Sequence, residues 1–173
     1  MKVIEQEIHS LKNSISEMWA LVHQQLYNAG EAMLTGDKEL AYKVISRERR
    51  VNAFELKIDS DCEDIIALYA PVAIDLRFVL AMYKINTNLE RLGDFAESIA
   101  RFAGNLPEGE PIDPQLVKET RVEEMLSELL SMISLTKEAF EKESSEIASR
   151  IFLKDNLIDE INHNSTAIIA KYI

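Results

Sequence analysis

Apolar residues recur along the chain in steps of three and four positions, which is the spacing of one buried face of an α-helix. The first apolar series stops at the Thr-Gly-Asp stretch of residues 35–37. The second stops at Pro71, because proline is not accommodated inside a helix, and the third stops at Gly104, a residue suited to a left-handed cap. The pattern predicts an all-α protein without strands, whose helices lie near residues 3–35, 38–69, 73–103, 114–142 and 145–173.

The helices are predicted to form two units joined by a linker. Residues 1–104 hold three long helices and are predicted to make a three-helix bundle, whereas the proline-containing residues 105–113 read as the linker. Beyond the linker the apolar pattern of the first half returns at a constant offset, so that Val44 aligns with Ile151. The fold class is therefore tandem three-helix bundles, with residues 114–173 forming a partial second repeat of two helices.

An incomplete second bundle would leave an apolar face open to water. We expect such a face either to pair with another chain, as in a homodimer or other homo-oligomer, or to be covered by a C-terminal segment that has been truncated. The residues predicted to form this face are Leu126, Leu129, Ile133, Ile151, Ile158, Ile161 and Ile168.

Composition and charge narrow the class of protein. With 173 residues, 47% hydrophobic and 28% charged, the chain can bury a sizeable core. A net charge of −11 disfavours nucleic acid and anionic membranes as partners, and the only basic run is the short "SRERR" of residues 46–50. The longest apolar run, residues 65–74, is too short to insert into a membrane, and the N-terminus lacks a signal-peptide core. We expect a cytoplasmic protein.

A pair of carboxylates provides the first candidate site. Glu90 and Asp94 are four residues apart and therefore project from the same side of a helix. The apolar stripe through Leu89 and Leu92 faces the core, which places both acids toward the outer surface. Glu90 and Asp94 are either part of a solvated face or part of a binding site.

The hairpin around Pro71 predicts what lies opposite these two acids. Helices 38–69 and 73–103 must be antiparallel, so Glu48 falls beside Asp94, and Asn52 beside Glu90. These residues form two facing rows of oxygen atoms, which Glu55 and Asp59 extend, and the second repeat supplies Asp155 and Asp159 at the equivalent positions.

Crowded carboxylates favour a cation, because like charges about 5 Å apart repel by roughly 3 kcal/mol at an effective dielectric near 20. Hard oxygen donors suit Mg, Ca, Mn or oxidised iron, and other first-row metals are compatible. The alternative is that nearby arginines neutralise the acids as ordinary surface ion pairs. The arginines available for this are Arg47, Arg49, Arg50 and Arg91.

Signals for catalysis are weak, which makes an enzyme the less favoured class. The three histidines, His9, His23 and His163, have no metal-binding spacing. Cys62 lies inside an apolar helix and is expected to be a small core residue. The sequence contains no Gly-rich phosphate loop and no arrangement typical of a Ser-His-Asp triad.

The stretch "YAPVAIDLRFVLAMYKINTNLERLGDFAESIARF", residues 69–102, resembles the signature of the PhoU family. In that family a Pro-Val-Ala-x-Asp-Leu-Arg turn opens a helix that ends in Glu-Arg-x-Gly-Asp-x-Ala-x-x-Ile-Ala. Residues 47–59 resemble the preceding helix, and residues 154–161 resemble its counterpart in the second half. The resemblance implies tandem three-helix bundles with iron or zinc clusters on Glu/Asp-x-x-x-Asp motifs, of which Glu90-x-x-x-Asp94 is one.

The resemblance also implies a function without catalysis. PhoU proteins are negative regulators of phosphate uptake and of phosphate-starvation signalling, and are thought to link the phosphate ABC transporter and its ATPase to a sensor histidine kinase. One alternative is the PhoU-like domain of a sodium–phosphate cotransporter, which is disfavoured because Met1 stands directly before the first helix. A metal-storage or metal-dependent hydrolytic protein is another alternative. Because the last helix of the second repeat is missing, only half a metal site is expected at Asp155 and Asp159.

Overall fold

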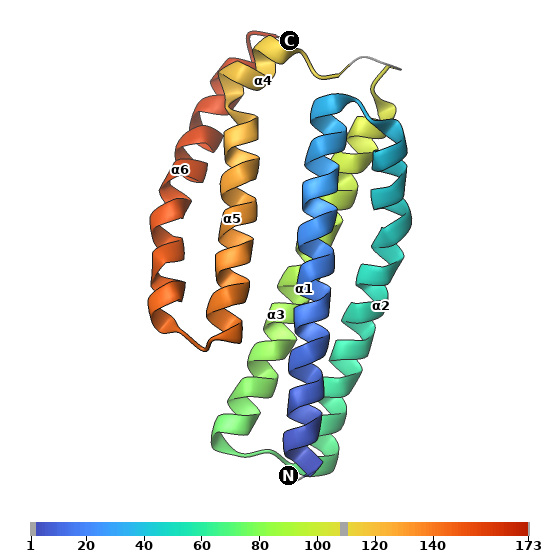
Figure 1. Cartoon of the computed structure of the whole chain (residues 1–173), viewed down its shortest axis with the longest axis vertical. Coiled ribbons are helices and arrows are strands. Elements are labelled where there is room, and N and C mark those ends of the chain that lie inside the picture. The colour runs from blue at the N-terminus through green and yellow to red at the C-terminus, as the bar shows by residue number, and fades with distance from the viewer. Residues whose placement is uncertain (1–2, 108–110, 173) are drawn as a thin grey trace.

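The computed structural model describes residues 3–107 and 111–172, and within them it is entirely helical, without a strand (Figure 1). The predicted fold class is therefore confirmed. Residues 108–110, in the middle of the predicted linker, lie outside the described residues. The helices are α1 (Val3–Thr35), α2 (Lys38–Tyr69), α3 (Ala73–Asn105), α4 (Pro114–Thr120), α5 (Val122–Glu141) and α6 (Ser145–Ile169).

Helices α1, α2 and α3 form a three-helix bundle around one apolar core. Asp37 begins α2 by accepting a hydrogen bond on Oδ1 from the backbone N–H of Leu40 at 2.9 Å. At the other end of α2 the chain reverses through Ala70, in the left-handed conformation, and Pro71. Fully buried apolar side chains from all three helices make up the core, among them Leu11, Ile15, Met18, Val44, Val51, Ile58 and Val79.

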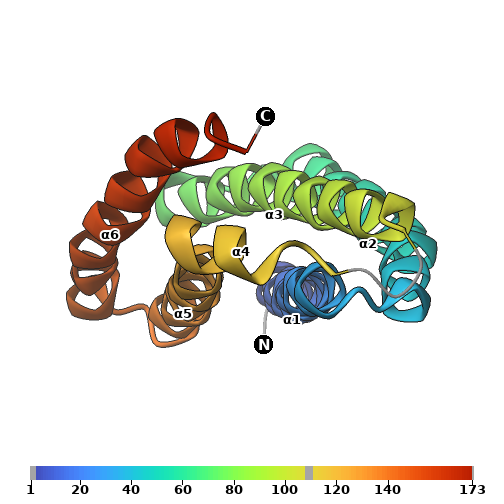
Figure 2. The same ribbon diagram turned by 90° about the horizontal axis from the view of Figure 1, so that it is seen from above.

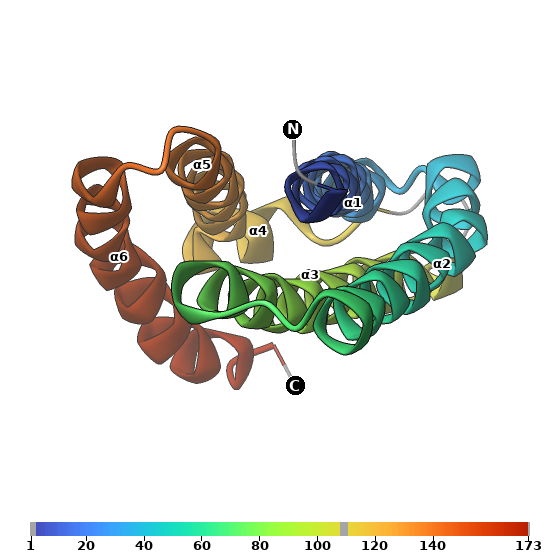
Figure 3. The same cartoon turned by 90° about the horizontal axis from the view of Figure 1, so that it is seen from below.

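Helix α5 lies against the first bundle and α6 lies on the outer flank of α5, as Figures 2 and 3 show from opposite ends. Ile133 of α5 belongs to the same apolar core as α1 to α3. Phe140 stacks on Trp19 of α1, with ring centroids 5.8 Å apart. The second unit is therefore anchored to the first bundle through α5.

This packing overturns the prediction of an open apolar face. Ile133 is 7% exposed and Ile161 2% exposed, and the other five residues of the predicted face are half-buried. A free-standing second unit would expose this face, whereas in the structure α5 is in contact with α1, α4 and α6. Pairing with another chain remains a prediction, but these seven residues do not form an exposed patch.

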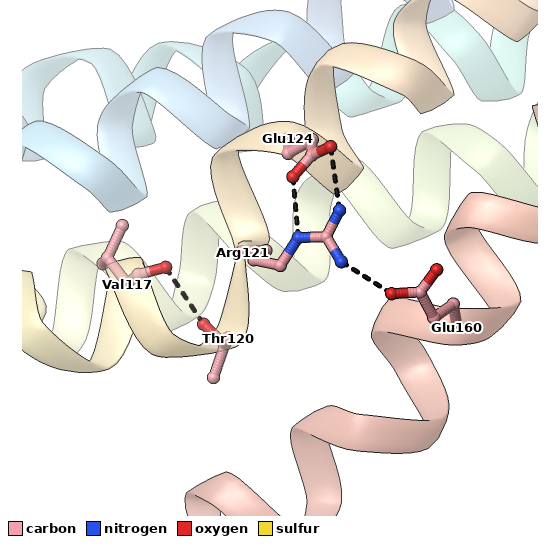
Figure 4. A network of polar contacts seen from close by, with 5 residues as sticks. All are labelled: Val117, Thr120, Arg121, Glu124 and Glu160. Carbon is pink, nitrogen blue, oxygen red and sulfur yellow. Dashed lines mark hydrogen bonds and ion pairs between the residues drawn. The ribbon is translucent and has the colours of Figure 1, made fainter.

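The predicted helix 114–142 is in fact two helices, because the chain breaks at Arg121. Arg121 has a φ of 55° in the left-handed region, which interrupts the helical hydrogen-bond ladder between α4 and α5. Its guanidinium donates to both carboxylate oxygens of Glu124 and, at 2.8 Å, to Glu160 of α6 (Figure 4). The Thr120 hydroxyl donates back to the Leu116 carbonyl at 2.7 Å and ends α4. These contacts hold the three helices at one junction.

Candidate functional site: an acidic groove between α2 and α3

The facing rows of oxygen atoms lie between α2 and α3, and the register of the two helices is the predicted one. The Asn86 side-chain amide of α3 donates to the Glu55 carbonyl at 2.9 Å and to Asp59 Oδ1 at 2.7 Å. Further toward the hairpin, the Cys62 thiol contacts the Val79 carbonyl, with 3.8 Å between sulfur and oxygen. The antiparallel pairing expected from Pro71 is therefore present, and Glu55 and Asp59 face α3.

A glycine allows the two helices to approach closely at the centre of the site. A Cβ atom added to Gly93 would lie 2.8 Å from Val51 Cγ1, closer than real Cβ contacts. Val51 is β-branched and rotates little within a helix, so only glycine permits this distance. The close approach brings Asp94, which follows Gly93, within electrostatic reach of Glu48 and Glu55 on α2.

The two carboxylate oxygens of Glu48 have different surroundings. Its Oε2 accepts a hydrogen bond from the Asn52 side-chain amide at 2.8 Å. Its Oε1 is buried and has no hydrogen-bond partner among the described residues. Burial raises the pKa of Glu48, and the charges of Glu97 and Asp94 raise it further, although Asn52 and Arg101 act in the opposite direction. Glu48 is therefore a carboxylate whose negative charge is poorly compensated.

Two further carboxylates of the groove have a similar electrostatic environment. Burial is the main cause that raises the pKa of Glu90, followed by the charges of Asp94 and Glu55. Hydrogen bonding of the protonated Glu90 carboxyl to the Asp94 side chain adds to the effect, because it favours the neutral form of Glu90. Burial and the charges of Asp59 and Asp94 raise the pKa of Glu55 as well. The groove concentrates negative charge from both helices.

The alternative in which nearby arginines neutralise these acids is not what the structure contains. In residues 3–107 and 111–172, the four arginines considered in the sequence form no ion pair with the groove, and the Nε of Arg49 donates to the Ser46 carbonyl instead. The cation that does contact the groove is Arg101, whose Nη2 lies 2.6 Å from Glu97 Oε1. The four arginines without such a pair are Arg47, Arg49, Arg50 and Arg91.

The chemistry of the groove fits a hard cation, although its side chains are not arranged as a finished metal site. Across the described residues, no three Asp, Glu, His or Cys side chains converge on one metal position. The donors are nevertheless carboxylate and amide oxygens, one of which is the unpartnered, buried Oε1 of Glu48. Burial, and after it the charges of neighbouring carboxylates, raise the pKa of Glu48, Glu55 and Glu90, and a cation would offset the repulsive part.

The six predicted metal ligands fall into two groups. Glu48, Asn52, Glu90 and Asp94 are brought together in the groove. The remaining two are the exposed residues Asp155 and Asp159, which lie on α6 and share no hydrogen bond with the groove within the described part of the chain.

Two groups of the groove were not anticipated. Glu97, whose charge acts on Glu48, could have been found from its position three residues after Asp94, on the same side of the helix. Asn86 is fully buried among apolar residues and fixes Asp59 by a hydrogen bond. In the sequence, a polar residue within an apolar series could have indicated that Asn86 makes a buried hydrogen bond.

Among residues 3–107 and 111–172, no Ser-His-Asp arrangement is joined by hydrogen bonds. Ser134 Oγ lies 3.1 Å from His23 Nε2 and 3.0 Å from the Leu130 carbonyl oxygen, and no carboxylate in the described part of the chain hydrogen-bonds the His23 ring. Burial raises the pKa of Cys62 to about 12, so the thiol stays protonated at neutral pH. Cys62 is a core residue, as its sequence context predicted.

Comparison with known proteins decides the family. The PhoU domain family profile matches residues 15–103, the bundle that carries the acidic groove. The chain belongs to the PhoU family. The PhoU homolog of Aquifex aeolicus, a phosphate-specific transport system accessory protein, is 33% identical over 169 residues, which are 96% of this chain and 74% of the relative. The PhoU of Escherichia coli is 34% identical over 154 residues, which cover 89% of this chain and 62% of that protein.

Solved PhoU structures have the same fold. The crystal structure of the phosphate transport system regulatory protein PhoU from Streptococcus pneumoniae has a TM-score of 0.86 and 28% identity, and the match covers 98% of this chain and 78% of that one. PhoU from Pseudomonas aeruginosa gives a TM-score of 0.85 and 26% identity, with coverage of 97% and 79%. The resemblance seen in residues 69–102 is therefore confirmed. No helix in the described part of this PhoU-family chain is long and apolar enough to span a bilayer.

Proposed function

We propose that this chain is a cytoplasmic regulator of phosphate uptake that acts by binding partners and has no catalytic step. Its partners would be the ATPase of a phosphate ABC transporter and a phosphate-sensing histidine kinase, and the chain would restrain both uptake and starvation signalling. Family membership supports the assignment, because the relatives are named accessory proteins of phosphate-specific transport. A bundle without an activated nucleophile among the described residues is compatible with a binding role.

The acidic groove between α2 and α3 is proposed to bind metal ions, with iron or zinc first and Mn, Mg or Ca as alternatives. Glu48, Glu90 and Asp94 would supply charged oxygen ligands, and Asn52 a weaker neutral one. The observation that carries this proposal is the unpartnered, buried Oε1 of Glu48 amid carboxylates whose pKa values are raised by burial and, after that, by one another's charges. A bound cation would supply the positive charge that the groove lacks and would tie α2 to α3.

Metal binding is tested by removing two acids of the groove together. Glu90→Ala with Asp94→Ala should abolish stoichiometric metal, measured by elemental analysis after loading with iron, zinc, manganese or magnesium and desalting. The matched control is Asp155→Ala with Asp159→Ala, the same two-acid change at the same helical spacing on α6. We expect the control to keep the metal of the first bundle. Circular dichroism should show unchanged helix in both variants, since all four side chains lie off the core.

Two results would contradict metal binding in the groove. One is a wild-type protein that retains no metal after loading, and the other is a Glu90→Ala, Asp94→Ala variant that retains as much as the wild type. The regulatory role is tested separately by pull-down from phosphate-replete and phosphate-starved cells. Recovery of the transporter ATPase or the histidine kinase, in amounts that change with phosphate, is expected. Recovery of neither, or metal-dependent phosphatase activity of the purified chain, would refute the adaptor role.

A further inference from the structure

Helix α5 covers only part of the surface on which it lies. It runs along α1 from Leu126, which lies against Gly30, to its end at Glu141, and in the turn that follows the Glu143 carboxylate pairs with Lys12 at 2.8 Å. On the side of α3, Ile133 and Thr136 of α5 line one pocket with Leu89. Helices α1 and α3 have 33 residues each and α5 has 20, a difference of 33 − 20 = 13 residues. At 1.5 Å per residue, this difference corresponds to about 20 Å of helix. Figure 1 shows α1 and α3 continuing beyond the end of α5, on the side of the N-terminus.

Within residues 3–107 and 111–172, no helix continues α5 along this remaining length. After α5 ends at Glu141, Glu143 adopts a left-handed conformation with a φ of 51°, and the Ser144 hydroxyl caps α6 by accepting from the Ile147 N–H. The backbone therefore reverses at the point where a longer α5 would have continued between α1 and α3. Beyond that turn, α5 no longer covers the surface between α1 and α3.

The uncovered surface is a groove with an apolar floor. It has a volume of about 680 Å³, and we refer to it as the α1–α3 groove. Its upper end is Phe140, the same side chain with which α5 packs on Trp19. The α1–α3 groove therefore continues an interface that already accepts a helix, and its apolar side chains are Ile8, Ile74, Phe78, Met82, Ile85 and Phe140.

The charged groups at the rim of the α1–α3 groove indicate what charge a binding partner would carry. Lys12 is already paired with Glu143, and its ammonium lies 5.5 Å from the centre of the Phe140 ring. Asp75, in the first turn of α3, is exposed and makes no ion pair within the described residues. Three carboxylates line the groove, those of Glu5, Asp75 and Glu143, against one ammonium group, that of Lys12, and a histidine, His9, on a chain whose net charge is −11. A partner with basic residues beside its apolar stripe would complement the rim.

We propose that the α1–α3 groove binds a basic amphipathic helix of about three turns, supplied by another protein, in the continuation of α5. Apolar side chains spaced i, i+3, i+4 and i+7 would enter the groove between Ile8 and Phe78, and lysines or arginines at the edges would face Asp75. A helix is the fitting partner because the backbone groups of α1 and α3 are already hydrogen-bonded within each helix, so a strand could not pair with them. This docking does not require the cation proposed for the acidic groove.

The probe is a synthetic amphipathic peptide of about 14 residues, made of leucine at i, i+3, i+4, i+7, i+8 and i+11 and lysine elsewhere, because a helix of this length spans about 20 Å. Binding to the full chain is followed by fluorescence anisotropy of the labelled peptide at physiological salt. A scrambled peptide of the same composition, without an apolar stripe, is the peptide control. We expect the amphipathic peptide to bind at least about tenfold more tightly, where tenfold corresponds to 1.4 kcal/mol. In methyl NMR spectra it should shift Ile8, Ile74 and Ile85 and leave Ile151 unmoved.

Two matched pairs of variants locate the binding. Ile74→Arg places a cation at the groove on a side chain that is 79% exposed, and Leu153→Arg makes a comparable change on α6 at a side chain that is 75% exposed. Asp75→Lys reverses a charge in the first turn of α3, and Glu146→Lys does the same in the first turn of α6. Both α3 variants should lower the affinity for the amphipathic peptide at least about tenfold, and both α6 variants by less than about twofold. All four variants should remain folded, because exposed positions tolerate substitution without unfolding.

Three outcomes would overturn the proposal. The first is equal affinity for the scrambled peptide, which would reduce the interaction to net charge. The second is equal weakening by the α3 and α6 variants. The third is a wild-type dimer in light scattering that Ile74→Arg converts to a monomer, which would make a second copy of this chain the occupant. Peptide binding that survives Glu90→Ala with Asp94→Ala supports the docking independently of the metal site.

Discussion

Gly30 of α1 receives the side chain of Leu126 of α5, and this contact offers a direct test of how the second unit is attached. A Cβ atom added to Gly30 would lie 3.1 Å from both Cδ1 and Cγ of Leu126, and closer still to Cδ2. All three of these nearest atoms belong to one side chain. Gly30→Ala should therefore disturb the seat of α5, and the disturbance should depend on Leu126 being present.

The effect of Gly30→Ala on the free energy of unfolding has two opposing contributions. Replacing glycine by alanine inside a helix stabilises it by about 0.8–1.0 kcal/mol. Forcing an extra methyl group into packed surroundings costs typically about 1–3 kcal/mol. Gly30→Ala should therefore lower the free energy of unfolding by about 0–2 kcal/mol. In a Leu126→Ala background the three clashing atoms are gone, so the same substitution should instead raise it by up to about 1 kcal/mol.

The assay is a double-mutant cycle measured by urea denaturation. The free energy of unfolding is obtained from circular dichroism for the wild type, Gly30→Ala, Leu126→Ala and the double variant. We expect a favourable coupling of about 1–3 kcal/mol, equal to the overpacking that Leu126→Ala relieves. Leu126→Ala with Gly104→Ala is the control, because nothing lies within 4 Å of a Cβ placed on Gly104. Additive effects of Gly30→Ala and Leu126→Ala would refute the seating of α5 on α1.

Two further predictions concern the helix junction and the acidic groove. Arg121→Gly should give a more stable protein than Arg121→Ala in thermal melts, because both lose the contacts with Glu124 and Glu160 but only glycine adopts a φ of 55° without strain; equal melting temperatures would contradict this. In chelator-treated protein, Glu90→Gln should stabilise at pH 7. Burial, and after it the charges of Asp94 and Glu55, raise the pKa of Glu90, so the folded state binds its proton more tightly than the unfolded chain does; the destabilisation by the ionised carboxylate is present above that pKa and is relieved as pH falls through it. The gain should fade toward pH 4.5, the ordinary value, and a gain independent of pH would show that Glu90 is not repelled.

The positions of most acids of the acidic groove could be predicted from the sequence. The acids Glu90 and Asp94 share a helix side because they are four residues apart, and Glu48 faces them because the turn at Pro71 permits few registers between α2 and α3. What could not be predicted is which oxygen atoms are satisfied. The hydrogen bond of Asn52 to Glu48, the unpartnered Oε1 and the contribution of Glu97 depend on side-chain conformations at a close helix contact.

The all-helical class and the bounds of the long helices could be predicted from the amino-acid sequence alone. The predicted helices 3–35 and 38–69 coincide with α1 and α2, and the third ends at Asn105 instead of residue 103. These features are local: a helical apolar period and its stop signals lie within a few turns of each other along the chain. A short hairpin between consecutive helices adds little freedom, so the three-helix bundle follows from the same information.

The construction of the second unit and its attachment to the first bundle could not be predicted from the sequence, because they depend on tertiary contacts. The break at Arg121 is held by Glu160, which lies 39 residues later, and α5 is seated where Gly30 leaves room for Leu126. Neither partner can be read from the pattern around the other, because the contacts join segments far apart in sequence. The burial of Ile133 and the uncovered end of the α1–α3 groove both follow from that docking, since a helix pattern specifies an apolar face but not which other surface will cover it.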